Sequence, residues 1–125
     1  MRRSQVSRAT LFRILAVLFA GAAAYHAVAF FDPAFSNGGA PWRHAFFCAT
    51  DILCAWYILR RPRWFVLPFS LFTIQQLCSH GAHAWRLWRA EGRLDWLSFA
   101  VPIVVPCTLA LLMRDALDQR PRQQA

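Results

Sequence analysis

Four histidines and one aspartate lie inside the long apolar runs of this sequence: His26, His44, Asp51, His80 and His83. Polar groups at membrane depth are costly, so they usually face a protein interior or a wet cavity. An acid is expensive to keep in such a place, and we expect Asp51 with His80 to be the functional pair. Imidazole and carboxyl groups exchange protons and bind metals, so these are the two chemistries to consider.

The spacing of these residues groups them on helical faces. In the third apolar run the polar positions recur at intervals of three, four and three residues: Thr73, Gln76, His80 and His83. In the second run the intervals are four and three: His44, Cys48 and Asp51. Residues three and four apart share one face of a helix. We therefore predict one polar pocket with these members: His26, Asp51, Gln76, His80 and His83.

A purely structural interpretation stays open for each of these residues. Asp51 can be a buried carboxyl, neutral or hydrogen-bonded to Gln76 or a histidine, that holds a helix bundle together. His44 and His83 lie close to the expected membrane interface, where water can solvate them. His26 stands beside alanines and can serve packing alone.

The cysteines offer a second chemistry. Soft metal ligands could come from four residues if their helices are neighbours: Cys48, Cys78, His80 and His83. A b-type haem needs two histidines at matched depth on facing helices, and His26 with His80 meets the depth condition. No C-x-x-C pair occurs, so a thioredoxin-type or quinone-linked disulfide-forming site has no support.

The composition indicates where these residues sit. The chain has 125 residues, of which 58% are hydrophobic and 16% charged, yet its formal net charge is +8. Soluble domains carry about a quarter charged residues. A nucleic-acid-binding domain would carry its basic residues on a polar face, whereas here the arginines lie mostly between apolar runs. The pattern excludes a soluble globular domain and a nucleic-acid partner.

Four apolar runs are each long enough to cross a bilayer, for which about 20 residues are needed. The predicted spans cover residues 11–31, 41–59, 64–85 and 96–113. We expect an all-α, antiparallel bundle of four transmembrane helices in a single domain, residues 1–113, followed by a polar tail, 114–125. Asn37-Gly38-Gly39 predicts a turn, and Gly92 and Asp95 predict a helix end and a helix start. The spans show no internal repeat.

The arginines predict the orientation, because positively charged residues favour the cytoplasmic side. Ten lie at the N-terminus, in the second link and in the tail, against four on the opposite side. Both termini are therefore expected in the cytoplasm, and the bilayer is expected to be a bacterial inner (plasma) membrane. Ala27-Val28-Ala29 would also suit the cleavage site of a signal peptide, but Arg13 interrupts that apolar core and favours a retained helix.

The depth of the polar residues follows from the helical rise of 1.5 Å per residue. His26 and His80 lie roughly 8 Å, and Asp51 roughly 10 Å, below the outer ends of their spans. The histidines and Asp51 would thus gather in the outer half of the membrane, and we expect their pocket to open outward.

The first half of the chain resembles the DoxX-like group of small four-helix bacterial membrane proteins. The likeness rests on four features: the helix from Leu11 to His26, Phe31-Asp32-Pro33, Pro41-Trp42, and Arg60-Arg61-Pro62-Arg63. Some members of that group are associated with quinone-linked sulfur oxidation or with redox-stress complexes. The resemblance implies a redox-associated membrane subunit and assigns no catalytic residue.

Three functions follow from these patterns. The first is an accessory or interaction subunit of a membrane redox system, with the lipid bilayer and a membrane protein as partners. The second is a redox protein that binds a metal or haem through the histidine, cysteine and aspartate residues. The third is a small proton-coupled carrier or a lipid-binding protein. No catalytic motif is recognisable, and the residues leave quinone, haem and metal open as cofactors.

Overall fold

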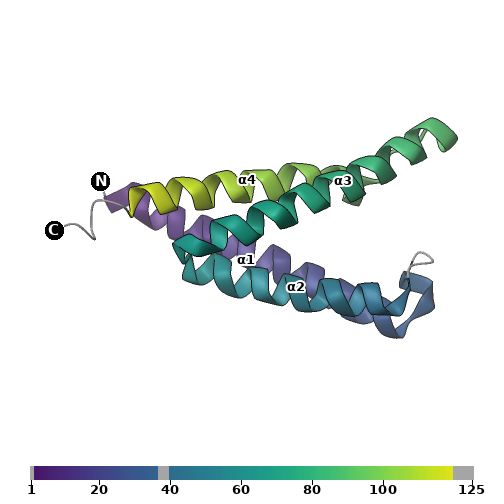
Figure 1. Ribbon diagram of the computed structural model, residues 1–125, viewed down its shortest axis with the longest axis horizontal. Helices are drawn as coiled ribbons and strands as arrows, with labels where there is room; N and C mark the ends of the chain where they lie inside the picture. The colour runs from purple at the N-terminus through teal and green to yellow at the C-terminus, as the bar shows by residue number, and fades with distance from the viewer. Residues whose placement is uncertain (1, 37–39, 120–125) are drawn as a thin grey trace. The chain divides into compact units, whose positions relative to one another are not determined.

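The protein is helical along its length. The computed structural model describes the backbone of residues 2–36 and 40–119, and the side chains of residues 8–36 and 40–119. Four α-helices follow one another within these ranges: α1 (Arg2–Phe31), α2 (Pro41–Arg60), α3 (Val66–Glu91) and α4 (Trp96–Asp118). Two short 3-10 turns, η1 (Pro33–Phe35) and η2 (Arg63–Phe65), precede α2 and α3 (Figure 1). The expected all-α class is confirmed.

The helices run beyond the apolar runs at several ends. The first helix begins at Arg2, the third continues to Glu91, and the fourth to Asp118, so the start of the expected polar tail is helical. The turn predicted at Asn37-Gly38-Gly39 and the end of the tail, residues 120–125, lie outside the described residues.

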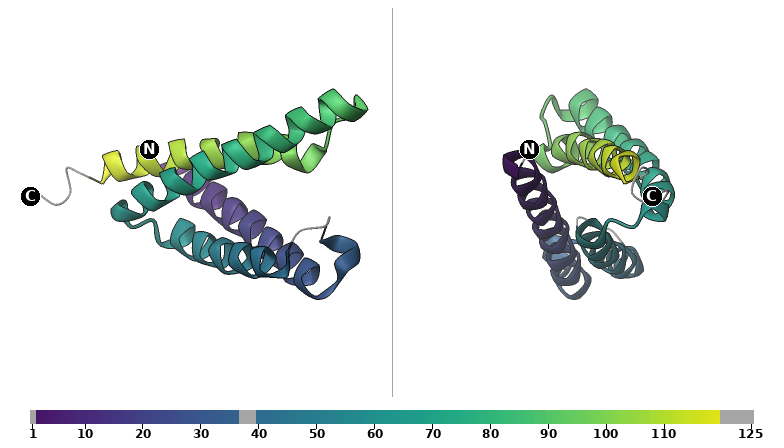
Figure 2. Two further views of the ribbon diagram at one scale, coloured as in Figure 1. Left: turned by 45° about the vertical axis from the view of Figure 1, so that its right-hand side comes forward. Right: turned by 90° about the vertical axis from the view of Figure 1, so that its left-hand side faces the viewer.

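The contacts divide the chain into two helical hairpins, Met1–Arg60 and Arg61–Ala125. We call them the first and the second hairpin and describe each by itself. Within the first, α1 lies along α2, and within the second, α3 lies along α4 (Figure 2).

The first hairpin is held by a buried stripe on α1. The stripe recurs with the three- and four-residue spacing of a helical face: Phe12, Leu15, Ala16, Phe19, Ala23 and Ala29. Its alanines let the two helices approach closely. Cys54 and Ile58 complete the buried face of α2. After α1, Asp32 caps η1 by accepting a hydrogen bond from the Ala34 amide at 2.9 Å.

The second hairpin buries threonine hydroxyls beside its apolar core, which includes Phe69 and Leu112. Thr73 donates its hydroxyl to the Phe69 carbonyl at 2.7 Å, and Thr108 donates to the Val104 carbonyl at 2.8 Å. Back-bonding of this kind satisfies a buried hydroxyl within its own helix. Both threonines can therefore stand among apolar residues at little cost.

The link between α3 and α4 has the predicted ends. Gly92 closes α3 in the left-handed conformation, with φ of 64°, and donates its amide to the Trp88 carbonyl. Glycine adopts this conformation without strain. Asp95 caps α4 by accepting hydrogen bonds from the amides of Leu97 and Ser98. Both sequence predictions are confirmed.

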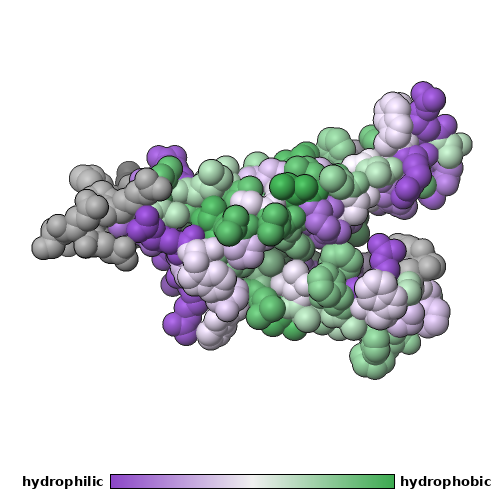
Figure 3. Space-filling model, in the orientation of Figure 1, coloured by the Kyte–Doolittle hydropathy of each residue, from purple (hydrophilic) through white to green (hydrophobic). Residues whose placement is uncertain are grey.

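Within the described residues, two helical segments are long and apolar enough to cross a membrane, Arg8–Phe31 and Trp96–Asp118. The core helix of a soluble protein would be mostly buried. Here only 28% and 22% of the apolar windows are buried. Large hydrophobic side chains such as Val17 and Ile103 are exposed instead, and Figure 3 shows apolar residues on the outward faces of the helices. Both helices thus present apolar surface outward.

Candidate functional site

A chain of polar groups runs through the first hairpin. His26 on α1 and His44 on α2 approach each other with their Nδ1 atoms 3.1 Å apart. The other ring nitrogen of His44, Nε2, lies 3.2 Å from the Ser36 carbonyl oxygen, just after η1. The other ring nitrogen of His26, Nε2, lies 3.8 Å from Oδ2 of Asp51. The order is therefore Asp51, His26, His44 and the Ser36 carbonyl.

This chain is largely shielded from solvent by its neighbours. Asp51 and His44 are only 5% and 9% exposed, and the His26 side chain is 23% exposed. The His26 ring stacks on Phe47, with ring centroids 5.4 Å apart, and meets Tyr25 edge-on at 5.3 Å. The aromatic contacts hold the imidazole in the orientation that directs one nitrogen to each polar neighbour.

The partners determine where the ring protons sit. A carbonyl oxygen only accepts hydrogen bonds, so His44 Nε2 must carry a proton. In neutral His44 the Nδ1 atom is then an acceptor, and His26 Nδ1 must donate to it. His26 Nε2 is left to face Asp51, and one further proton resides on either of these two groups. The first hairpin thus holds a proton shared between an acid and an imidazole.

A proton can move along this chain without any group changing place. If Asp51 passes its proton to His26 Nε2, then His26 Nδ1 can pass its own proton to His44 Nδ1. The result is an ionised Asp51, a neutral His26 and a protonated His44. Imidazole suits this role because it accepts a proton at one nitrogen while it releases one from the other.

The chain also spans depth along the helices. His44 lies three residues after the start of α2 at Pro41, and Asp51 lies ten residues after it. At 1.5 Å per residue these positions are about 5 Å and about 15 Å along a helix of 20 residues. The predicted depth of roughly 10 Å for Asp51 is therefore wrong, because Asp51 stands at the middle of α2. The polar chain connects the loop end of the hairpin with the middle of its second helix.

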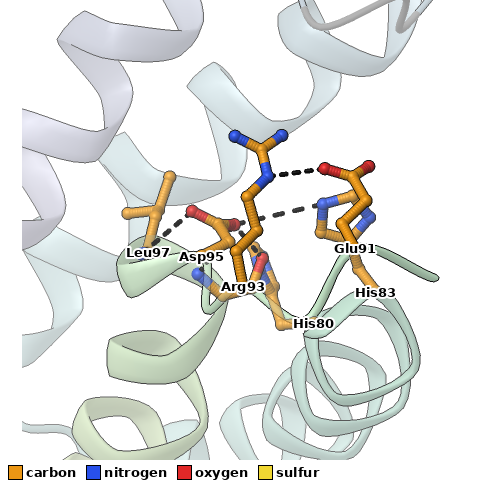
Figure 4. A network of polar contacts seen from close by, with 7 residues as sticks. His80, His83, Glu91, Arg93, Asp95 and Leu97 are labelled. Atoms are coloured by element: carbon orange, nitrogen blue, oxygen red, sulfur yellow. Dashed lines mark hydrogen bonds and ion pairs between the residues drawn. The ribbon is translucent and has the colours of Figure 1, made fainter. Parts of the chain in front are cut away.

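A second polar cluster lies at the loop end of the second hairpin (Figure 4). Ser98 donates its hydroxyl to Oδ2 of Asp95 and lies 3.4 Å from Nδ1 of His80. Nε2 of the half-exposed His83 lies 4.0 Å from the same carboxylate oxygen. The Ser98 hydroxyl, followed by the Ser98 and Leu97 amides, lowers the pKa of the Asp95 carboxyl below its usual range. Asp95 is the anionic centre of this cluster.

This cluster has the residue types of a serine hydrolase but not the order of their hydrogen bonds. In a Ser-His-Asp triad the serine donates to the imidazole, which donates to the acid. Here Ser98 donates to Asp95 directly. The serine has only one proton to give, so His80 must donate its Nδ1 proton to the serine oxygen. The arrangement caps α4 and ties α3 to it, and it provides no base for a serine nucleophile.

The predicted pocket residues divide between the hairpins. His26 and Asp51 come together in the first, joined by His44. His80 and His83 lie around Asp95 in the second. The pairing of Asp51 with His80, and of His26 with His80 for a haem, joins residues of different hairpins and stays a prediction.

Gln76, the remaining member of the predicted pocket, is buried on α3 and donates its amide to the Gln75 side chain at 2.9 Å.

The predicted metal ligands are also divided. Cys48 is half-buried on α2 and Cys78 is exposed on α3, and both are free thiols. Within residues 8–36 and 40–119, no three histidine, cysteine, aspartate or glutamate side chains group so as to hold a metal ion. The set of Cys48, Cys78, His80 and His83 therefore has no support within either hairpin.

Sequence reasoning placed His44 at a solvated interface and left Ser98 out altogether. The useful signal for His44 was its spacing of seven residues from Asp51, which puts both on one face of α2. For Ser98 the signal was its place three residues after Asp95, where a helix cap is completed.

No protein-family model, curated protein or solved structure matches the chain. The resemblance to the DoxX-like group stays a prediction, and a function has to be argued from the residues themselves.

Proposed function

We propose that this chain is an integral membrane protein that crosses a bacterial plasma membrane four times, with both termini in the cytoplasm. The two most apolar helices, with their outward apolar surface, support insertion into a bilayer. The other two are long enough to follow: α2 has 20 residues and α3 has 26, which at 1.5 Å per residue is about 30 Å and about 39 Å. The distribution of arginines supports the orientation.

Within that frame, the first hairpin binds a proton and conducts it between the outer surface and the middle of the membrane. The observation that carries this proposal is the continuous chain from Asp51 through His26 and His44 to the Ser36 carbonyl. In the proposed orientation its loop end faces outward, and the partly exposed His26 ring lets a proton enter or leave. Asp51 is the inner end of the chain.

Electrostatics gives Asp51 a reason to hold a proton. A lone carboxylate at membrane depth is costly, so it must be neutralised or paired. With the proton on Asp51 the pair is neutral, and with the proton on His26 it is an ion pair at 3.8 Å. Both states avoid an isolated charge, so the proton can change place at moderate cost.

The proposed activity is therefore that of a small proton-coupled carrier or a proton-binding subunit. A subunit of a membrane redox system would use the same chain to take up the protons that accompany electron transfer. Purification in a mild detergent distinguishes the two: a stable larger complex would assign the proton to a partner, and an isolated chain would favour a carrier.

Infrared difference spectroscopy tests the proton site. In lipid nanodiscs, a pH step should change the carbonyl-stretch band of a protonated carboxyl in the wild-type protein. Asp51→Asn should abolish the change, because it removes the carboxyl that shares a proton with His26. Asp32→Asn is the matched control, since Asp32 is an exposed helix-capping acid of the same hairpin. If Asp51→Asn leaves the band change in place, the proton site is elsewhere.

A further inference from the structure

The two hairpins place their histidine contacts at the same sequence separation. His26 contacts His44, 18 residues later, and His80 contacts Ser98, also 18 residues later. The difference between 80 and 26 and the difference between 98 and 44 are both 54 residues. In each hairpin a histidine of the first helix therefore contacts the same position of the second helix.

The buried face of the second helix follows the same shift. The buried residues of α2 are His44, Asp51, Cys54 and Ile58. Moved by 54 residues, these positions become the buried residues of α4: Ser98, Val105, Thr108 and Leu112. Every buried position of one helix thus corresponds to a buried position of the other.

The first helix of each hairpin agrees with this register. Leu15 and Phe19 of α1 are buried, and so are the residues 54 positions later, Phe69 and Thr73 of α3. Helical periodicity alone would allow several registers between two such helices. The same shift is selected independently by the histidine contact, which lies between the helices.

The amino acids themselves agree at conspicuous positions. Residues 11–60 and 65–114 align under this shift without a gap, and identical residues occur in four pairs: His26/His80, Gly38/Gly92, Trp42/Trp96 and Arg60/Arg114. The chain has only 4 histidines, 5 glycines and 6 tryptophans, so such matches are more informative than matches of leucine or alanine. They fall on the contact histidine, the link, the start of the second helix and its basic end.

We propose that the chain is a tandem repeat of one helical hairpin, and that the His80–Ser98 contact is a second, diverged copy of the proton site of the first hairpin. Val105 stands where Asp51 stands, so the second copy lacks the buried acid. Ser98 stands where His44 stands, so its relay is shortened to one imidazole. This replaces the expectation that the spans hold no internal repeat.

The repeat can be tested by exchanging residues between the copies. Ser98→His should bring an imidazole against His80 in the way that His44 lies against His26. In a uniformly nitrogen-15-labelled sample, a scalar coupling through the hydrogen bond should then join His80 Nδ1 to the Nδ1 atom of the introduced ring. Ser70→His is the control, because Ser70 is a half-buried serine of α3 whose hydroxyl binds the Val66 carbonyl. It should create no such coupling.

A folded Ser98→His protein in which His80 shows no coupling to the new ring would overturn the proposal. If this variant does not fold, the reverse exchange decides. His44→Ser should leave His26 protonated at Nδ1 and donating to the introduced hydroxyl, as His80 does to Ser98. A His26 that instead carries its proton on Nε2 would contradict the equivalence of the two sites.

Adding Val105→Asp to Ser98→His should restore the complete site, with a second protonated carboxyl in the infrared spectrum. This last step rests on the proposed function, whereas the nitrogen couplings report the register alone. A coupling without the carboxyl band would support the repeat and count against proton binding.

Discussion

His26 and His44 meet through the same ring atom, with Nδ1 of one 3.1 Å from Nδ1 of the other. Two bare nitrogen lone pairs would repel at this distance, and so would two N–H groups, so the contact requires one proton between the rings. Because the Ser36 carbonyl requires a proton on His44 Nε2, the donor in the neutral pair is His26. This single contact sets the tautomer of both rings and directs His26 Nε2 toward Asp51.

Replacing His44 by phenylalanine should destabilise the protein. The change keeps a ring of similar size but leaves the His26 N–H and the Ser36 carbonyl without their partner. Loss of a buried partner costs about 1–3 kcal/mol, which denaturant unfolding in detergent micelles can measure. His83→Phe, at a side chain that is 50% exposed, is the matched control and should change stability by no more than about 0.5 kcal/mol. Equal effects of the two changes would count against the His26–His44 contact.

Replacing Asp51 by leucine should leave membrane insertion and stability nearly unchanged. His26 would keep its hydrogen bond to His44 and would simply be neutral at Nε2, so we expect a change within about 1 kcal/mol. Breaking a structural buried ion pair would instead cost about 3–5 kcal/mol. Unfolding of this variant therefore separates a proton-binding acid from a structural one, and a loss in the higher range would show that Asp51 serves the bundle.

The charge on Asp95 should make stability depend on acid pH. Its pKa is lowered in the folded protein by the Ser98 hydroxyl and two amides. A depressed pKa means that the contribution is present above the pKa of the unfolded chain and is lost as the pH falls through the lower, folded value. Unfolding midpoints should thus be steady near neutral pH and decline below about pH 4.

Asp95→Ala should remove part of that decline and, at neutral pH, cost about 0.5–2 kcal/mol as a lost helix cap. Asp118→Ala, at the opposite end of α4, removes the same charge without touching the cap and should cost less. An unchanged acid limb in Asp95→Ala would mean that the cap does not titrate.

The four-span orientation predicts which residues a membrane-impermeant thiol reagent can reach. In a background with the four native cysteines replaced by alanine, Glu91→Cys should be labelled in intact cells, since the link after α3 faces outward. Gln119→Cys, just after α4, should be labelled only after the membrane is opened. The reverse result, or labelling of both in intact cells, would contradict four spans with cytoplasmic termini.

Much of the fold could be predicted because its determinants are local. Gly92 and Asp95 mark the ends of α3 and α4 by their own conformational and capping preferences. The shared face of His44 and Asp51 follows from helical spacing. The apolar length of each run is likewise a property of consecutive residues.

The site was less predictable because it depends on how one helix is rotated against another. Depth alone suggested His80 as the partner of Asp51, whereas the contact made within the first hairpin is with His26. Nothing in the spacing of α1 or α2 taken singly shows that His26 and His44 meet. The repeat was hidden for a different reason: apolar helices exchange leucine, alanine and valine freely, so few identities survive.

The most direct test of the proton chain is the scalar coupling between the Nδ1 atoms of His26 and His44 in nitrogen-15-labelled wild-type protein. We predict a coupling across this hydrogen bond, with His44 carrying its other proton on Nε2, and loss of the coupling in His44→Phe. Rings that show no coupling, with both in the Nε2–H form, would contradict the chain that links Asp51 to the surface.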